Sequence, residues 1–118
     1  KILFAGDLMF RQRVPFVGQA DSRHWQKGLT SLAALKVDWA IPGHGPASQQ
    51  FAQDLQQTQI YLQYLRTTMA RAVEEGLSFE EAYQLTDWSQ FSNLPLFNYA
   101  NRMNAFNTYL LMEQESLK

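Results

Sequence analysis

Two residues of this sequence, Asp7 and His44, have the chemistry and the setting of metal ligands. Asp7 follows a short apolar run at residues 2–5, and His44 follows a second run at residues 37–41. If a helix connects two parallel strands, their carboxyl ends meet at one edge of the sheet, where α/β folds place ligands. A carboxylate and an imidazole together suit Zn²⁺, Mn²⁺ or iron, and an Asp oxygen can bridge two ions. Asp7 and His44 are therefore our candidate metal ligands.

Each candidate also has a plainer interpretation, which the residues alone leave open. An Asp after a strand often forms a turn or caps a helix, and a His in the Pro- and Gly-rich segment 42–46 can be an ordinary loop residue. We expect His24 to be solvated or to take part in capping, because it falls in the first turn of a predicted helix. Arg11 and Arg13 could meet an anionic substrate near Asp7, but solvated loop charges are the simpler interpretation.

A strand–helix–strand unit over residues 1–47 would position the two candidate ligands. The first strand is short and ends at Gly6-Asp7, and the second ends at the turn Pro42-Gly43-His44. Between them, Asp21 or Ser22 can cap a helix. The apolar stripe of this helix comprises Trp25, Leu29, Leu32 and Leu35.

Residues 48–118 have the periodicity of a helical tail. A long helix is predicted to end at Gly76, and Ser78 with Glu81 forms a capping box for a short helix through Leu85. A last helix is predicted from Phe97 to Glu115. The residues expected to be buried are Leu55, Thr58, Leu62, Leu65, Met69 and Ala72 on the long helix, and Ala100, Met103, Phe106 and Leu110 on the last one.

Composition limits the function classes. The 118 residues are 46% hydrophobic and 18% charged with a net charge of −1, which is typical of a globular domain and gives no nucleic-acid footprint. The chain has no Cys, which excludes thiolate ligands and a cysteine nucleophile, and no apolar run reaches membrane-spanning length. Because Lys1 leads directly into an apolar strand, we expect the chain to begin partway through a larger fold.

Two segments resemble motifs of the metallo-β-lactamase superfamily. The segment Ile2-Leu3-Phe4-Ala5-Gly6-Asp7-Leu8-Met9-Phe10 is similar to its strand that ends in Gly-Asp, and Val37-Asp38-Trp39-Ala40-Ile41-Pro42-Gly43-His44-Gly45-Pro46 to its later Pro-Gly-His-Gly motif. Their order, their separation and an intervening helix with Trp25 also match. The helical tail, with Asn98-Tyr99-Ala100-Asn101-Arg102-Met103-Asn104 and Glu113, more weakly resembles the periplasmic branch related to sulfur-oxidation and quinoprotein-relay hydrolases.

The resemblance implies that Asp7 is the bridging carboxylate and His44 the last histidine ligand of a dinuclear site, most often with two Zn²⁺ ions, although Mn or Fe is possible. It implies an α/β fold: a single partial domain over residues 1–118, the C-terminal part of an αββα sandwich, with two short strands and a helix-rich tail. A longer parent protein would use metal-bound hydroxide to hydrolyse an ester, thioester or amide of a small-molecule substrate. A periplasmic location is favoured by the tail.

The sequence departs from the family where most of the ligands should be. The His-x-His-x-Asp-His motif is absent, and His24 and His44 are the only histidines. We therefore expect the chain alone to be inactive and to need the missing N-terminal half, or a second copy of itself, as a partner. The alternative is a non-catalytic helical interaction or oligomerisation module that retains a relic sheet edge.

Overall fold

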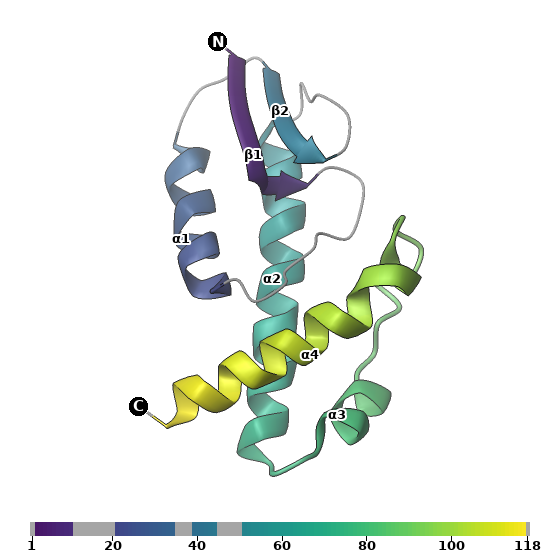
Figure 1. Ribbon diagram of the computed structural model, residues 1–118. Helices are drawn as coiled ribbons and strands as arrows, with labels where there is room; N and C mark the ends of the chain where they lie inside the picture. The colour runs from purple at the N-terminus through teal and green to yellow at the C-terminus, as the bar shows by residue number, and fades with distance from the viewer. Residues whose placement is uncertain (1, 11–20, 35–38, 45–50, 118) are drawn as a thin grey trace.

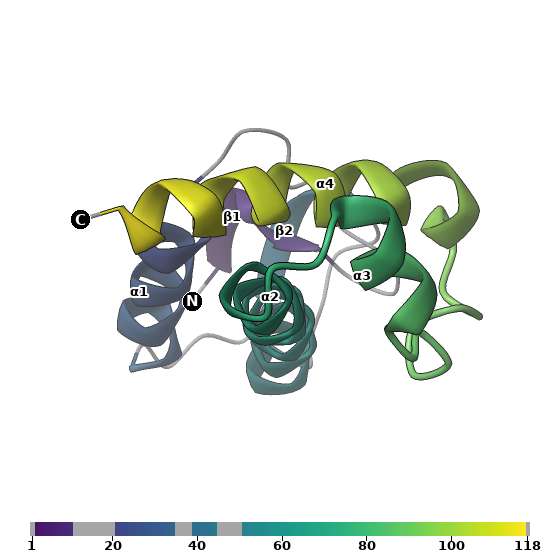
Figure 2. The same cartoon turned by 90° about the horizontal axis from the view of Figure 1, so that it is seen from below.

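The computed structural model of the protein describes residues 2–10, 21–34, 39–44 and 51–117, with only the backbone described for the strands and for residues 32, 33 and 51. In Figure 1, α4 crosses one half of α2 while the strands lie beside the other half. Figure 2 shows α4 running along one side of α1, α2 and α3. In chain order the elements are β1 (Ile2–Phe10), α1 (Ser22–Ala33), β2 (Trp39–His44), α2 (Phe51–Glu74), α3 (Phe79–Leu85) and α4 (Phe97–Ser116).

The predicted α/β fold class is wrong, because the architecture is all-α. Four helices, with Phe91 on the connection between α3 and α4, supply all of the described hydrophobic core. A sandwich needs sheets broad enough to pack face to face. Among the described residues, β1 and β2 pair only with each other, and a two-stranded pair is marginal by itself. The chain is thus a four-helix body with a two-stranded ribbon, not part of an αββα sandwich.

Helix α2 is the centre of the core. The predicted stripe is confirmed, since all six of its residues are buried: Leu55, Thr58, Leu62, Leu65, Met69 and Ala72. The helix ends at Glu74, and Gly76 follows with φ of +72°, a left-handed conformation that glycine adopts without steric cost. The predicted stop at Gly76 is therefore confirmed.

The predicted capping box of α3 is also confirmed. The Glu81 N–H donates to Ser78 Oγ at 3.2 Å, and the Ser78 N–H donates to Glu81 Oε1 at 3.1 Å. These two bonds satisfy backbone groups that the first helical turn would leave unpaired. The sequence also placed the end of α3 correctly, at Leu85.

At the start of α1, Asp21 is the capping residue: its Oδ1 accepts from the Arg23 N–H at 3.0 Å and from the His24 N–H at 3.5 Å. Trp25 and Leu29 are buried as predicted. The other two residues of the predicted stripe cannot be compared, because the Leu32 side chain and all of Leu35 lie outside the described residues.

The predicted bounds of α4 are right, but its predicted buried face is wrong. Ala100 is buried, whereas Met103 is 61% exposed and Phe106 and Leu110 are each 39% exposed. The helix instead turns a small and polar face toward α2. That face comprises Ala100, Asn101, Asn104, Ala105, Thr108 and Met112.

Candidate functional site

The two candidate metal ligands lie on the two-stranded ribbon. β1 and β2 run parallel, with Leu3 opposite Ala40 and Gly6 opposite Pro42. β1 continues beyond the predicted end at Asp7 as far as Phe10, and β2 includes His44 as its last residue. Asp7 is therefore within a strand rather than at its end.

The register changes around Asp7. Gly6 is opposite Pro42 and Phe10 is opposite His44, so β1 advances four residues where β2 advances two. Such a bulge bends the strand and re-aims its side chains, and bulges are common beside active sites. The backbone of Asp7 thus lies in the irregular part of the ribbon, three residues before the position that faces His44.

The side chains of Asp7 and His44 lie outside the described residues, so their assignment as ligands stays a prediction. Arg11 and Arg13 lie wholly outside them. In the described ranges, no three His, Cys, Asp or Glu residues come together in a group that could hold a metal ion.

His24 takes part in capping, as predicted. Its side chain is 77% exposed, and its Nδ1 lies 3.2 Å from Asp21 Oδ2. Desolvation raises the pKa of Asp21, but hydrogen bonds from the Arg23 and His24 backbone outweigh it and the pKa is lowered. The contacts of His24 therefore serve the start of α1.

A charge cluster that the sequence did not reveal joins α1, α2 and α4. Glu115 Oε1 accepts from Arg66 at 2.6 Å and from Arg23 at 2.8 Å, and Arg66 also donates to Ser22 Oγ at 3.0 Å. The hydrogen bond from Arg66 is the main cause that holds the pKa of Glu115 below its usual value. The two arginines share one glutamate, so the cluster joins the three helices and carries a net charge of +1.

A second unforeseen group is a buried polar network between α2 and α4. Tyr61 Oη donates to Asn101 Oδ1 at 2.6 Å and accepts from Asn104 Nδ2 at 3.1 Å. Asn101 Nδ2 then donates to Tyr83 Oη at 3.1 Å. Burial raises the pKa of the Tyr61 hydroxyl, which keeps it protonated and able to donate. The signal in the sequence was two Asn residues three apart, beside the small residues Ala100 and Ala105.

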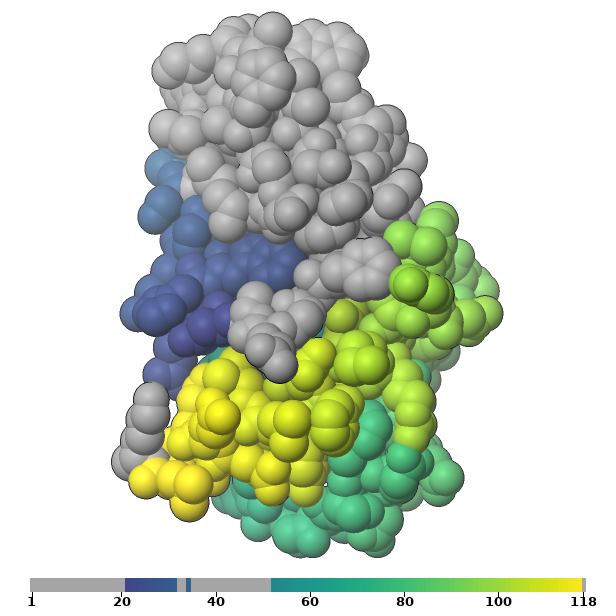
Figure 3. All heavy atoms as spheres, viewed as in Figure 1, coloured from purple at the N-terminus to yellow at the C-terminus, as the bar shows by residue number. Residues whose placement is uncertain are grey.

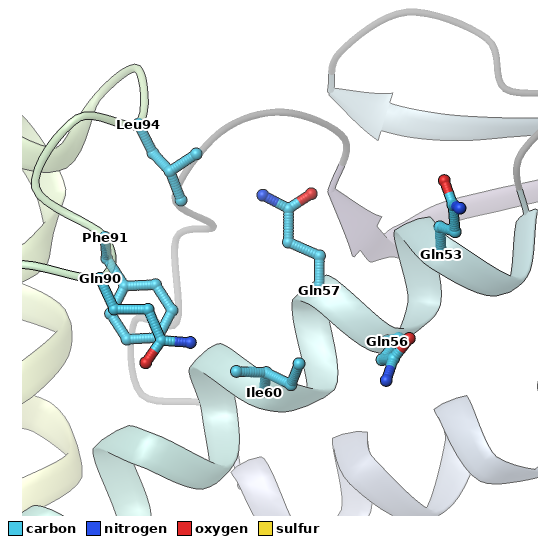
Figure 4. Close-up of a pocket in the computed structure, with 7 residues that line it drawn as sticks. All are labelled: Gln53, Gln56, Gln57, Ile60, Gln90, Phe91 and Leu94. Carbon is cyan, nitrogen blue, oxygen red and sulfur yellow. The ribbon is translucent and has the colours of Figure 1, made fainter.

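A pocket of about 260 Å³ opens between α2 and the connection from α3 to α4 (Figure 4). Its polar side chains are amides, which do not titrate in the physiological range and are poor nucleophiles. The described lining can therefore hydrogen-bond a ligand but supplies no acid, base or nucleophile. The lining residues are Gln53, Gln56, Gln57, Ile60, Gln90, Phe91 and Leu94.

No model of a known protein family matches the chain, and no curated protein is detectably similar to it in sequence. Among the described helices, none is long and apolar enough to cross a membrane.

Proposed function

We propose that this chain contributes Asp7 and His44 to the metal centre of a metal-dependent hydrolase. The observation that carries the proposal is that the segment with the Gly-Asp motif and the segment with the Pro-Gly-His-Gly motif pair with each other as strands β1 and β2. They lie side by side in parallel, in a register that puts His44 opposite Phe10. Asp7 lies three residues before Phe10, which is on the order of 10 Å along a regular strand at about 3.3 Å per residue. The bulge shortens this distance between Asp7 and the position opposite His44.

The chemistry of the pair supports the same proposal. A carboxylate and a neutral imidazole are suitable ligands for Zn²⁺, Mn²⁺ or iron. Bound metal would lower the pKa of a water molecule and provide the hydroxide for hydrolysis of an ester, thioester or amide. The chain has two histidines, and His24 is engaged at α1, so further histidine ligands would come from other polypeptide. The four-helix body would then hold the ribbon in place.

Metal content tests this proposal. We expect the hydrolase assembled with this chain to contain stoichiometric Zn, Mn or Fe by elemental analysis. Asp7→Ala and His44→Ala should each lower the metal content, whereas the matched control His24→Ala should leave it unchanged. Full metal content in both variants would refute the assignment of these two ligands.

A second candidate function is an interaction module, and the apolar outer face of α4 favours it. Soluble domains seldom leave large apolar side chains exposed in a continuous row unless something binds there. Met103 lies on this face with 61% of its surface exposed, so a bound partner would shield it from hydroxyl radicals. Labelling of Met103 should therefore be weaker in cells, where a partner is present, than in the dilute purified chain. Equal labelling in the two conditions would refute an interaction through this face.

A further inference from the structure

The outer face of α4 carries an apolar row, which we call the α4 stripe and define as Tyr99, Met103, Phe106, Leu110 and, two turns further on and just after the end of the helix, Leu117. The spacings of four, three, four and seven residues put all five on one side of the helix, within about 40° of a common direction at 100° per residue. This is the repeat by which helices pack against each other in coiled coils.

The stripe lies on the side of α4 away from α2, and at its centre Phe106 also packs edge-on against Phe79 of α3 at 5.2 Å. The buried residues of α4 lie on the opposite side of the helix. Figure 2 shows α1, α2 and α3 on that buried side, and in Figure 3 the α4 residues form much of the face toward the viewer. Tyr99 is 77% exposed and Leu117 87% exposed, and the three residues between them are at least 39% exposed.

The polar network explains why α4 turns this way. Asn101 and Asn104 bond Tyr61 across the contact with α2, so rotating α4 to bury the stripe would break both hydrogen bonds. The four-helix body therefore cannot cover the stripe without losing its own buried bonds. A cover must come from outside this body.

We propose that a second copy of this chain covers the stripe, with the two α4 helices packed antiparallel about a two-fold axis near Phe106. This dimer rests on the interaction function proposed above, for which the second copy would be the partner, and it involves neither Asp7 nor His44. A two-fold contact requires a surface that is complementary to itself. Here Met103 of one copy would lie opposite Leu110 of the other, and Phe106 would meet its own symmetry mate.

Charge complementarity selects the antiparallel arrangement. Arg102 and Glu113 lie on the same flank of the stripe, four residues before and seven after Phe106. In an antiparallel pair, each Arg102 lies on the same flank as the partner copy's Glu113 and within about 3 Å of it along the helix axis. The dipoles of the two helices also point in opposite directions, which is favourable. In a parallel pair, Arg102 and the partner copy's Glu113 would lie on opposite flanks of the contact and about 16 Å apart along the helix axis, so they could not pair. Within its own copy, Arg102 pairs with Glu80 and is held over the Phe79 and Tyr83 rings at 5.3 and 5.1 Å. Its side chain is still 54% exposed, so the partner copy's Glu113 would be a second acceptor for the guanidinium.

The area is sufficient for a dimer. With about 200 Å² for each fully exposed side chain of this size, the exposed fractions leave on the order of 600 Å² of stripe per chain. The flanking residues bring the contact toward the roughly 800 Å² per partner of a standard protein interface. We therefore expect a reversible dimer.

Sedimentation velocity on the full chain, between about 1 and 100 µM, tests the partner. We expect a concentration-dependent dimer whose dissociation constant rises at least tenfold in Leu110→Glu. Leu85→Glu is the matched control, because Leu85 is 75% exposed on α3 outside the stripe, and it should leave the dimer unchanged. Circular dichroism checks that each variant folds. The proposal is overturned if the wild-type chain is monomeric at every concentration, or if Leu110→Glu leaves the dissociation constant unchanged. In that case, the hydroxyl-radical labelling of Met103 in cells decides separately whether another partner binds the stripe.

Two further measurements test the direction of packing. Arg102→Glu and Glu113→Arg should each weaken the dimer, and the double variant should restore it. Since the chain has no cysteine, Phe106→Cys should cross-link to its own symmetry mate, whereas two copies of Tyr99→Cys, about 20 Å apart, should not. Efficient cross-linking by both Cys variants, or a double variant as weak as the single ones, would show that the antiparallel arrangement is wrong.

Discussion

Replacing Tyr61 by Phe tests whether the buried polar network holds α4 against α2. The change removes one oxygen atom and leaves the ring, which packs edge-on against Phe91 at 5.1 Å. Tyr61 is 2% exposed, so water cannot readily replace the lost hydroxyl. Asn101 Oδ1 loses its donor, and Asn104 loses one acceptor.

The expected loss follows from these two bonds. Depriving a buried polar group of its partner costs about 1–3 kcal/mol, and losing the second bond adds about 1 kcal/mol. We therefore expect Tyr61→Phe to lower the free energy of unfolding by about 2–4 kcal/mol. That is a large part of the roughly 5–15 kcal/mol that stabilises a typical domain, and it corresponds to a fall in Tm of about 10 °C for a chain of this size.

Urea denaturation followed by circular dichroism measures this loss. Tyr64→Phe is the matched control: its hydroxyl donates to the Asp87 carbonyl oxygen from a half-buried site, so it should cost about 1 kcal/mol or less. Combining Tyr61→Phe with Asn101→Leu should cost less than the sum of the single changes, because both partners then become apolar. A loss for Tyr61→Phe no larger than that for Tyr64→Phe would refute the reasoning.

Three other changes probe the helix ends and the ion pair on α4. Ser78→Ala removes half of a capping box and should lower the free energy of unfolding, measured by urea denaturation, by about 1 kcal/mol, while Ser89→Ala, outside any helix, should lower it little. Leu96 precedes α4 with φ of +69°, so Leu96→Asn should raise the stability of the monomer by up to about 1 kcal/mol, because Asn adopts this left-handed conformation with less strain than Leu; an unchanged Tm would count against it. The pKa of Glu115 is lowered by Arg66, so the pair stabilises the fold above the carboxyl's unfolded pKa and is lost as pH falls through the folded one. Stability should therefore fall more between pH 7 and pH 3 in the wild type than in Glu115→Gln, and equal falls would exclude the pair as a source of acid sensitivity.

Local patterns predicted the individual helices well, because their signals lie within a few neighbouring residues. The α2 stripe from Leu55 to Ala72 repeats every three or four residues over five turns, and only a helix puts such residues on one face. The stop at Gly76 and the capping box at Ser78 depend on one or two residues each. No distant contact is needed to recognise any of these features.

The candidate site could be predicted only as two motifs and their order. The sequence placed Asp7 and His44 on neighbouring strands, but it did not show that β1 continues to Phe10 or that the register slips beside Asp7. Register depends on which backbone groups meet across the strands, and a two-residue slip leaves no mark in the composition of either strand. The fold class was wrong because it assumed other strands, and the described residues contain none beyond this pair.

Helix α4 shows which features local sequence patterns can predict and which depend on contacts with other helices. The sequence determined that Phe97 to Glu115 is helical and that an apolar row lies along one side of it. It did not determine which side faces inward, since the row and the opposite side, with Asn101 and Asn104, are both regular on a helix. Tertiary structure decided this, because Tyr61 and Tyr83 present hydroxyls that the two Asn side chains can bond only when the apolar row faces outward. Hydrophobic burial has no direction, whereas a buried hydrogen bond requires a specific partner at a specific place.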